Sequence, residues 1–269
     1  MPEPGRGHGC RADPMGVAIG RVAAAARSTE GAGGPVDPAW RRRTAALLRE
    51  AFFGIVRALE CDVLIECGAR AAETSIRFLE EAGRRAIALE ANPYPFIERT
   101  AKATEHGVDA RNLGVGRAAG VLDLRIPWSS TSLTSGFASL MPRIGGEDYA
   151  SIPVEITTLD AIGATVSASA RIAVWVDVEG STFEVLAGGE GLLERDGCQV
   201  LFVEVEEQPF WEGQRLAADV DEHLCLAGYV PNMRDAEYEH QHNVKYVRAA
   251  ALPAVDEHVA GFWSALMAV

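Results

Sequence analysis

Asp62-Val63-Leu64-Ile65-Glu66-Cys67-Gly68-Ala69 carries the strongest structural signal in the chain. A short apolar run that ends in an acid and a glycine is typical of a buried parallel strand followed by a tight turn. Apolar residues then recur at helical spacing over residues 73–82, and a second apolar run at residues 85–89 ends in Glu90. This strand–helix–strand alternation predicts right-handed βαβ units and an α/β fold with a parallel sheet.

The segment before this strand divides into two parts. Residues 1–36 are rich in Gly, Ala and Arg and poor in bulky apolar residues, so we expect a flexible N-terminal tail. Pro38 suits the first turn of a helix, and apolar residues at helical spacing extend that helix to Leu59. The chain of 269 residues is long enough for one domain over residues 37–269, with its core at residues 62–248.

The alternation of strands and helices continues to the end of the chain. Further strands are expected at residues 110–115, 120–126, 154–158, 172–178, 199–205, 229–233 and 244–248. Further helices are expected at residues 93–105, 181–193, 216–227 and 256–267. The polar stretch at residues 127–152 predicts a long loop, and a loop of that length inside a domain is usually functional or mobile.

Composition limits the partners of the chain. The formal net charge is -13, and an acidic surface repels nucleic-acid phosphates and anionic membranes, so we expect neither as a partner. No apolar run is long enough to span a membrane, and the N-terminus lacks the apolar segment of a secretory signal. The five cysteines are odd in number and form no CxxC pair, so we expect a reducing compartment, the cytoplasm. The apolar face of residues 47–59 offers a surface for a second copy, so a homo-oligomer is an open alternative.

The acids at the ends of the first two strands predict a nucleoside site. Ligands of open α/β sheets bind beyond the carboxyl ends of the strands, where Gly68 and Ala69 let the backbone approach a ligand. Glu90 is suited to accept hydrogen bonds from ribose hydroxyls. These features do not separate S-adenosylmethionine from NAD, and the missing GxGxxG pattern counts against a nicotinamide-dependent oxidoreductase.

A second group of acids follows two later strands. Asp177 and Glu179 end the apolar run before Gly180, and Glu204 lies at the end of the next strand. Such acids are suited to act as a general base or to hold a divalent metal such as magnesium through oxygen atoms. The alternative is a structural role, because acids also stabilise the N-terminus of the helix that follows.

The order of these motifs resembles the FkbM-type methyltransferases from about Asp62 to Val247. The resemblance rests on the motifs together rather than on any one of them. They are Asp62 to Ala69, Ala88-Leu89-Glu90-Ala91-Asn92-Pro93, Val154-Glu155-Ile156-Thr157-Thr158-Leu159-Asp160, Val176-Asp177-Val178-Glu179-Gly180, Glu184-Val185-Leu186-Ala187-Gly188 and Asn243-Val244-Lys245-Tyr246-Val247.

The resemblance implies a class I, Rossmann-like fold, doubly wound, with a mostly parallel seven-stranded sheet and an antiparallel last strand. It implies S-adenosylmethionine as methyl donor and a hydroxyl of a sugar or secondary-metabolite small molecule as acceptor. Asp177, Glu179 and Glu204 are the expected catalytic residues, and no metal ligand is assigned. The expected cofactor-binding residues are Glu66, Gly68, Ala69, Thr74, Glu90, Asn92, Asn112 and Asp177.

Three residues outside the motifs are candidates for contact with the acceptor. Trp128 and Ser132 lie in the long polar loop, and His242 precedes the last expected strand. Loop residues of these types are more often simply solvated, so the assignment depends on their place in the fold.

The chain departs from the family pattern at two places. Arg70-Ala71-Ala72 replaces the asparagine and glycine that the family tends to carry after the first strand. Trp175 replaces a lysine two residues before Asp177. These departures keep open a nucleoside-binding module that has lost catalysis.

Overall fold

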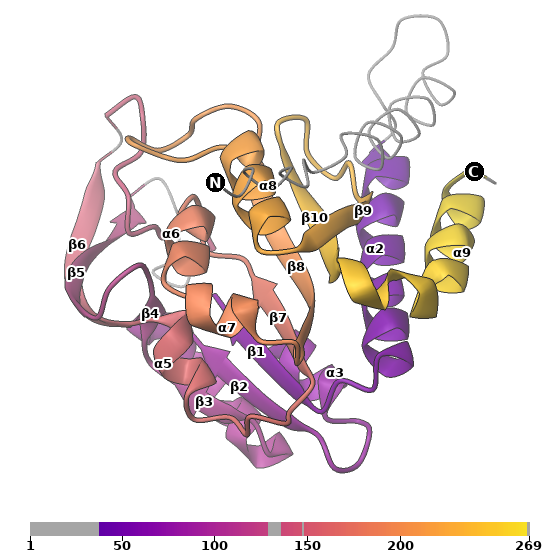
Figure 1. The fold of residues 1–269 in the computed structure, drawn as a ribbon. Helices are drawn as coiled ribbons and strands as arrows, with labels where there is room; N and C mark the ends of the chain where they lie inside the picture. The colour runs from indigo at the N-terminus through magenta and orange to yellow at the C-terminus, as the bar shows by residue number, and fades with distance from the viewer. Residues whose placement is uncertain (1–37, 129–135, 147, 268–269) are drawn as a thin grey trace, which may run out of the picture.

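The computed structural model describes residues 38–128, 136–146 and 148–267. Within them a central seven-stranded sheet has the order β3-β2-β1-β7-β8-β10-β9 (Figure 1). Its strands are β1 (Val63–Cys67), β2 (Arg85–Leu89), β3 (Asp109–Arg111), β7 (Ile172–Val176), β8 (Cys198–Glu206), β9 (Tyr229–Arg234) and β10 (Gln241–Arg248). The expected tail at residues 1–36 and Ser132 lie outside the described residues.

The strand directions confirm the expected fold class. Strands β3, β2, β1, β7 and β8 run parallel to their neighbours. The last strand in the chain, β10, runs antiparallel to both β8 and β9. The fold is therefore α/β, with a mostly parallel sheet and an antiparallel last strand.

Helices cover both faces of this sheet, as a doubly wound fold requires. One face carries α2 (Pro38–Ala58), α3 (Glu73–Phe78) and α9 (Asp256–Met267). The other face carries α5 (Leu159–Gly163), α6 (Thr182–Ala187), α7 (Glu190–Glu194) and α8 (Ala217–Leu226). Each face has its own apolar core, because alternate residues of every strand point to opposite sides of the sheet.

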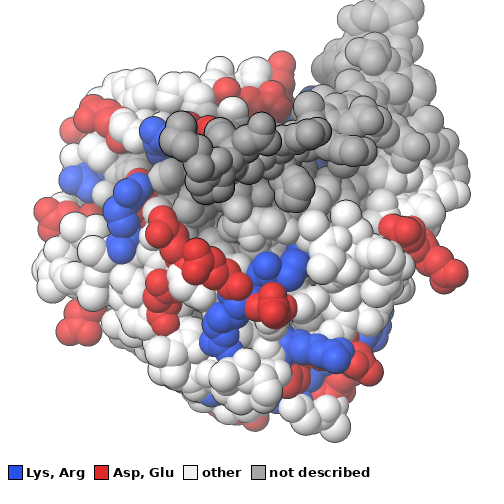
Figure 2. All heavy atoms as spheres, in the orientation of Figure 1, with Lys and Arg blue, Asp and Glu red and all other residues white. Residues whose placement is uncertain are grey.

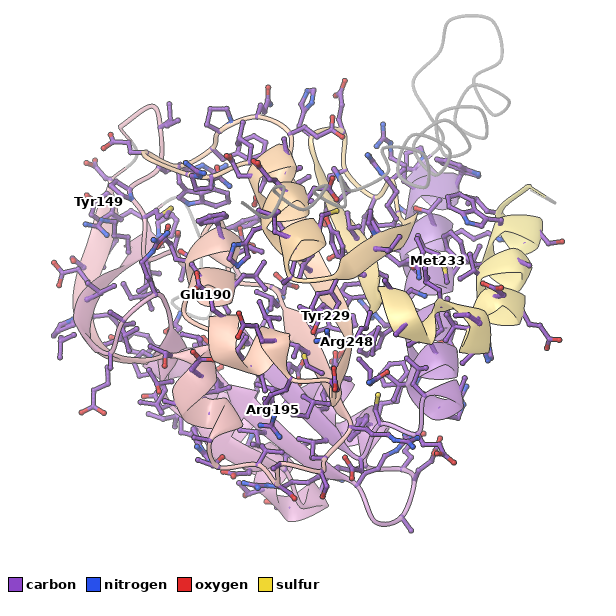
Figure 3. The ribbon with its side chains drawn as sticks, viewed as in Figure 1. Tyr149, Glu190, Arg195, Tyr229, Met233 and Arg248 are labelled. Atoms are coloured by element: carbon purple, nitrogen blue, oxygen red, sulfur yellow. The ribbon has the colours of Figure 1, made fainter. Side chains whose placement is uncertain are left out.

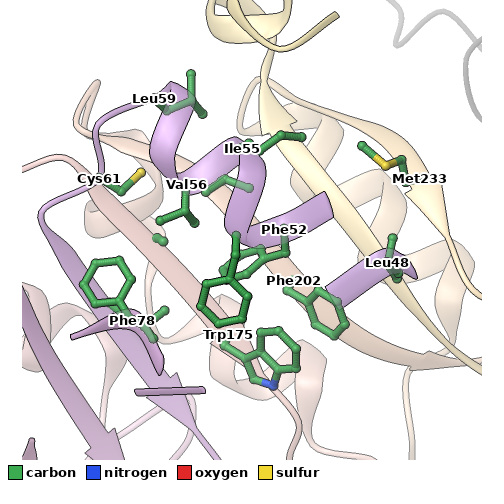
Figure 4. Packing of buried hydrophobic residues seen from close by; sticks show 14 of the residues in the cluster. Leu48, Phe52, Ile55, Val56, Leu59, Cys61, Phe78, Trp175, Phe202 and Met233 are labelled. Carbon is green, nitrogen blue, oxygen red and sulfur yellow. The ribbon is translucent and has the colours of Figure 1, made fainter. Parts of the chain in front are cut away.

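Helix α2 buries its apolar face inside the same chain. Leu48, Phe52, Ile55 and Val56 are buried against the sheet, where Phe52 meets the ring of Trp175 edge to face (Figure 4). Burial of a side chain of this size stabilises a fold by roughly 1.5–3 kcal/mol. Part of the surface that the sequence offered to a second copy is thus covered by β8, β10 and α9.

A second, three-stranded sheet stands beside the first, in the order β4-β6-β5. Its strands are β4 (Gly114–Val115), β5 (Gly120–Pro127) and β6 (Tyr149–Thr157). The single strand expected at residues 110–115 is wrong, because β3 belongs to the large sheet and β4 to the small one. Pairing of β5 with β6 extends to Pro127 and Tyr149, so the loop expected at residues 127–152 is shorter at both ends.

Several helices are shorter than their apolar spacing predicted. The helix expected at residues 181–193 divides into α6 and α7 at Gly188 and Gly189. A Cβ atom on Gly188 would lie 2.1 Å from the carbonyl oxygen of Gly116, so only glycine allows this approach to the segment after β4. The helix expected at residues 93–105 divides into α4 (Pro93–Glu98) and the 3-10 helix η1 (Thr100–His106), and Arg99 between them is not helical.

Hydrogen bonds tie the end of β10 to the start of β8. Arg248 Nε donates to the carbonyl oxygen of Cys198 at 2.9 Å, and Arg248 Nη2 donates to that of Arg195 at 2.8 Å. The Tyr229 hydroxyl lies 2.9 Å from the same Cys198 oxygen, and Figure 3 shows Tyr229 and Arg248 side by side. These contacts hold the end of the antiparallel strand β10 against the start of β8.

None of the helices in the described residues is long and apolar enough to cross a bilayer. On the face drawn in Figure 2, acidic and basic side chains are interspersed over the surface.

Candidate functional site

The carboxyl ends of four neighbouring strands meet at two adjoining cavities. The larger cavity has a volume of about 570 Å³ and is lined by Gly68, Glu90, Asp177, Glu179 and Glu204, among others. The smaller one, of about 410 Å³, lies beside it. The residues that line both cavities are Arg49, Gly68, Arg70, Trp175 and Asp177. Volumes in this range are typical of small-molecule sites.

Gly68 brings the ends of β1 and β7 into contact. Its φ is +81°, and a Cβ atom built on it would lie 1.7 Å from the carbonyl oxygen of Asp177. Its amide donates to the carbonyl oxygen of Leu89 at 2.9 Å. Only glycine fits between these two backbones, so Gly68 sets the distance between Asp177 and the turn after β1.

The turn after Gly68 is held in a conformation that its residues disfavour. Arg70 and Ala72 have φ values of +46° and +53°, in the left-handed region that asparagine and glycine adopt more readily. The Arg70 amide donates to Glu90 Oε2 at 2.7 Å, and Thr100 Oγ1 donates to the Arg70 carbonyl at 2.6 Å. The turn therefore keeps a glycine-like backbone although its sequence departs from the family pattern.

Glu90 is the buried acid at the end of β2. Its Oε1 accepts a hydrogen bond from the Asn92 amide at 2.7 Å, and its pKa is raised because burial outweighs this donor and the Arg70 amide. Asn92 accepts from the Tyr94 amide and caps α4. Asn112 Nδ2 donates to the Glu90 carbonyl at 2.7 Å. The two asparagines thus fix the backbone around Glu90, and neither is among the residues that line the two cavities.

Glu66 lies at the other side of the turn and lines the smaller cavity together with Ala69 and Thr74. Its Oε2 accepts hydrogen bonds from the amide and the hydroxyl of Ser75. Burial raises the pKa of Glu66 to about 7 against the opposing effect of the Ser75 and Thr74 donors. Four arginines contribute positive charge to the same cavity: Arg49, Arg70, Arg77 and Arg99.

Asp177, Glu179 and Glu204 form one cluster of acids, as their strand positions predicted. One carboxyl oxygen from each lies within 4.8 Å of the others. Burial, with repulsion from Asp177 and Glu206, raises the pKa of Glu179 to about 8. Burial also raises the pKa of Asp177 to about 6 and that of Glu204 well above its ordinary value. The cluster therefore holds protons more tightly than separate acids would.

A second strained backbone position supports this cluster. Glu179 has a φ of +46° and precedes Gly180, whose φ is +84°. The hydroxyl of Ser139, itself 3% exposed, donates to the Glu179 carbonyl at 2.6 Å and accepts from the Met141 amide at 3.1 Å. Such strain persists only where the surrounding structure fixes it, and it is common at functional sites.

Aromatic rings form another wall of the larger cavity. Trp175 and Phe202 stack at 3.6 Å between centroids with 6° between their planes, and both line the cavity (Figure 4). The two residues are direct neighbours across β7 and β8. Trp175 therefore gives the site a flat apolar surface where the family tends to have a cationic side chain.

Comparison with known proteins assigns the family. A model described as the methyltransferase FkbM domain matches residues 66–231. The chain belongs to the FkbM methyltransferase family. This protein is accordingly a methyltransferase rather than a nicotinamide-dependent oxidoreductase, and its sheet is that of the class I enzymes.

Solved structures of other methyltransferases share little sequence with this FkbM protein. Magnesium protoporphyrin IX methyltransferase of Synechocystis PCC 6803, with bound SAM, has 14% identity over 88% of this chain and 97% of its own, with a TM-score of 0.41. The 1,6-didemethyltoxoflavin-N1-methyltransferase of Burkholderia thailandensis has 15% identity over 76% and 78%, with a TM-score of 0.37. Precorrin-6y C5,15-methyltransferase of Geobacter metallireducens GS-15 has 11% identity over 74% and 86%, with a TM-score of 0.40. None of the curated proteins compared with the chain matches it.

The three expected acceptor residues lie in different places in this FkbM enzyme. Trp128 is 66% exposed and is not among the residues that line either cavity. Ser132 lies outside the described residues. His242 is buried on the opposite face of the sheet, in the core of Val203 and Val244, and burial lowers its pKa to about 3. The structure does not bring His242 to the cavities, because β10 turns Gln241 and Asn243 toward them instead.

The larger cavity also has walls that the sequence did not indicate. Arg49 reaches it from α2, and Phe137 reaches it from the loop after β5. Another group comes from β10 and the connection before it: Asp235, Glu237, Tyr238, Gln241 and Asn243. Asn243 belongs to a family motif and donates to both oxygens of Asp235 at 2.9 Å. Most of the others are polar residues outside the motifs, and no periodic pattern marks them.

Proposed function

We propose that this enzyme transfers a methyl group from S-adenosylmethionine to a hydroxyl of a sugar or secondary-metabolite small molecule. One observation carries the proposal: Glu90, the Gly68 turn and the acid cluster at Asp177 line one cavity. A nucleoside-binding acid and a group able to handle a hydroxyl proton are thus within reach of one small molecule and its donor.

The residues around the turn suit the donor. S-adenosylmethionine supplies a methyl group on a positively charged sulfur. Glu90 holds two backbone amides and keeps lone pairs for ribose hydroxyls. The smaller cavity, with Glu66, Ala69 and Thr74 on its wall, suits the methionine part, and Arg49 offers a cation for a carboxylate.

The acid cluster suits the acceptor. An alcohol is a poor nucleophile, so the hydroxyl must be polarised and must give up its proton as the new oxygen–carbon bond forms and the sulfur–carbon bond breaks. We assign this work to Asp177, Glu179 and Glu204 together, because their carboxyl oxygens lie within 4.8 Å of one another. The stacked rings of Trp175 and Phe202 offer a flat apolar surface for the ring of an acceptor.

Other features of this function stay predictions. Contact of Trp128 and Ser132 with the acceptor is one of them. Location in the cytoplasm and assembly with a second copy are likewise predictions.

Calorimetric titration with S-adenosylhomocysteine, and separately with NADH, tests the donor. We expect micromolar binding of S-adenosylhomocysteine alone. A screen of hydroxylated acceptors with isotope-labelled S-adenosylmethionine then tests transfer, with the product's methyl position read by NMR. Binding without transfer to any acceptor would indicate a module that has lost catalysis, and binding of NADH alone would contradict the proposal.

A further inference from the structure

Three carboxylates in the larger cavity have the spacing of ligands around one metal ion. Oxygen ligands lie about 2.0–2.6 Å from Mg²⁺ or Ca²⁺, so ligands on opposite sides of one ion are about 4–5 Å apart. The ligand oxygens of Asp177, Glu179 and Glu204 all lie within 4.8 Å of one another. They come from the ends of the neighbouring strands β7 and β8, which are parallel and directly paired.

Buried oxygens at this place have no partner in the described part of the chain. Glu204 is 8% exposed, and its Oε1 accepts no hydrogen bond. Glu206, two residues further along β8 on the same side, is 2% exposed and its Oε1 also lacks a partner. A buried carboxylate without a partner is costly, so each of these oxygens needs a positive group, either a proton or a bound cation.

The described side chains do not supply that positive group. Within residues 38–128, 136–146 and 148–267, no ion pair joins a lysine or arginine to Asp177, Glu179, Glu204 or Glu206. Arg49 and Arg70 act on Asp177, and Arg143 and Arg70 act on Glu179, through longer-range attraction. Trp175, which stands where the family tends to have lysine, brings no charge to this wall.

We propose that Asp177, Glu179 and Glu204 bind a divalent cation of the oxygen-preferring class, such as Mg²⁺ or Mn²⁺. Three carboxylates without nitrogen or sulfur ligands favour this class over zinc or copper. Glu206 lies next to the site and adds negative charge around it. The cation would hold the acceptor hydroxyl and lower its pKa, and the hydroxyl proton would pass to a carboxylate oxygen of the cluster that does not ligate the ion. This role rests on the proposed function, whereas the binding of the ion does not.

Titration of the metal-stripped full-length protein with Mn²⁺ tests the site. Mn²⁺ gives an electron paramagnetic resonance signal that falls when the ion is bound, so the free and bound ion can be counted directly. We expect one ion per chain with affinity tighter than roughly millimolar, and a loss of at least about tenfold in Asp177→Asn and Glu204→Gln. Glu190→Gln is the matched control, because Glu190 is exposed on α7, on the other face of the sheet (Figure 3).

Thermal unfolding separates loss of a ligand from loss of the fold. Without metal, at a pH high enough to ionise the cluster, Glu204→Gln should melt at a higher temperature than the unmodified chain, because it removes one of the mutually repelling acids. Added Mg²⁺ should then raise the melting temperature of the unmodified chain and of Glu190→Gln by more than that of Glu204→Gln. A variant that was merely misfolded would melt lower in both conditions.

The remaining outcomes are also decisive. Mn²⁺ that stays free at roughly millimolar concentration would overturn the proposal, as would equal binding by Glu204→Gln. Binding of a protonated amine, such as an amino sugar, in place of the metal would overturn it as well. Tight binding of S-adenosylhomocysteine without any metal binding would contradict this inference alone, whereas metal binding without S-adenosylhomocysteine would contradict the proposed function alone.

Discussion

The backbone amide of Arg70 donates a hydrogen bond to the Glu90 carboxylate at 2.7 Å and so joins the turn after β1 to the end of β2. The other carboxyl oxygen of Glu90 accepts from the Asn92 amide. One side chain therefore fixes two backbone segments, of which the turn at Arg70 lines the larger cavity. The geometry of the expected nucleoside site depends on this acid even when no ligand is bound.

Glu90→Gln should weaken both the turn and the binding of S-adenosylhomocysteine. The amide group keeps the size of the side chain but places an N–H₂ against a backbone N–H, and an unsatisfied buried donor costs about 1–3 kcal/mol. We expect lower stability in urea and an affinity reduced by roughly tenfold or more in calorimetry. Glu105→Gln, on the exposed surface of η1, is the control. Equal behaviour of the two variants would contradict the role given to Glu90.

Ala72→Gly should leave the protein as stable as before or more stable. Ala72 has a φ of +53°, which costs a residue with a side chain about 1–2 kcal/mol and costs glycine almost nothing. Ala46→Gly, at an exposed position inside α2, should instead destabilise by about 1 kcal/mol. Chemical denaturation of both variants checks the prediction, and a clear loss of stability in Ala72→Gly would show that the buried methyl group matters more than the strain.

The sequence could predict what depends on apolar runs and on the residues that end them. Buried strands with acids at their ends predict that Glu66, Glu90, Asp177 and Glu204 lie at one edge of the sheet, where the structure has them. Helix ends were harder to predict, because the division between α6 and α7 comes from the close approach of Gly188 to the backbone of Gly116 after β4, which no local pattern shows.

The face on which a side chain lies was the least predictable feature of the site. Asn243 and His242 are adjacent in a short polar segment, yet only Asn243 lines the cavity. The register of β10 against β8 decides between them, since a shift by one residue exchanges the two faces. Arg49 lies outside the motifs altogether and reaches the site through the packing of α2.

Replacement of Trp175 should be costly because of its stack with Phe202. Trp175→Ala should destabilise by about 3–5 kcal/mol. In a double-mutant cycle, Trp175→Leu and Phe202→Leu should show a coupling of about 0.5–1.5 kcal/mol, as expected for rings that interact beyond their buried area. Denaturation of the two single variants and the double variant measures it. Strictly additive effects would mean that the stack contributes only through burial.

Glu66 should make stability depend on pH. Folding raises its pKa from 4.5 to about 7, so the folded chain holds this proton more tightly than the unfolded chain. Its contribution to stability is complete below pH 4.5 and is lost as the pH rises toward 7, on the order of 3 kcal/mol in all. Glu66→Gln removes this contribution.

The measurement for Glu66 is the free energy of unfolding at several pH values. Between acidic and mildly basic pH, the unmodified chain should lose more stability than Glu66→Gln does. The other buried acids largely cancel in the comparison, except Asp177, whose charge also raises the pKa of Glu66. Parallel curves for the two proteins would show that Glu66 stays ionised in the fold.

Phe52 of α2 touches both rings of the Trp175–Phe202 stack, and Gln241 and Asn243 close the cavity from the last strand. All three lie outside residues 66–231, the span that defines the family. An excised fragment limited to that span would lack one side of its binding cavity and the support beneath its aromatic wall. The smallest fragment of this enzyme with a complete site is therefore longer than the span that the family model matches.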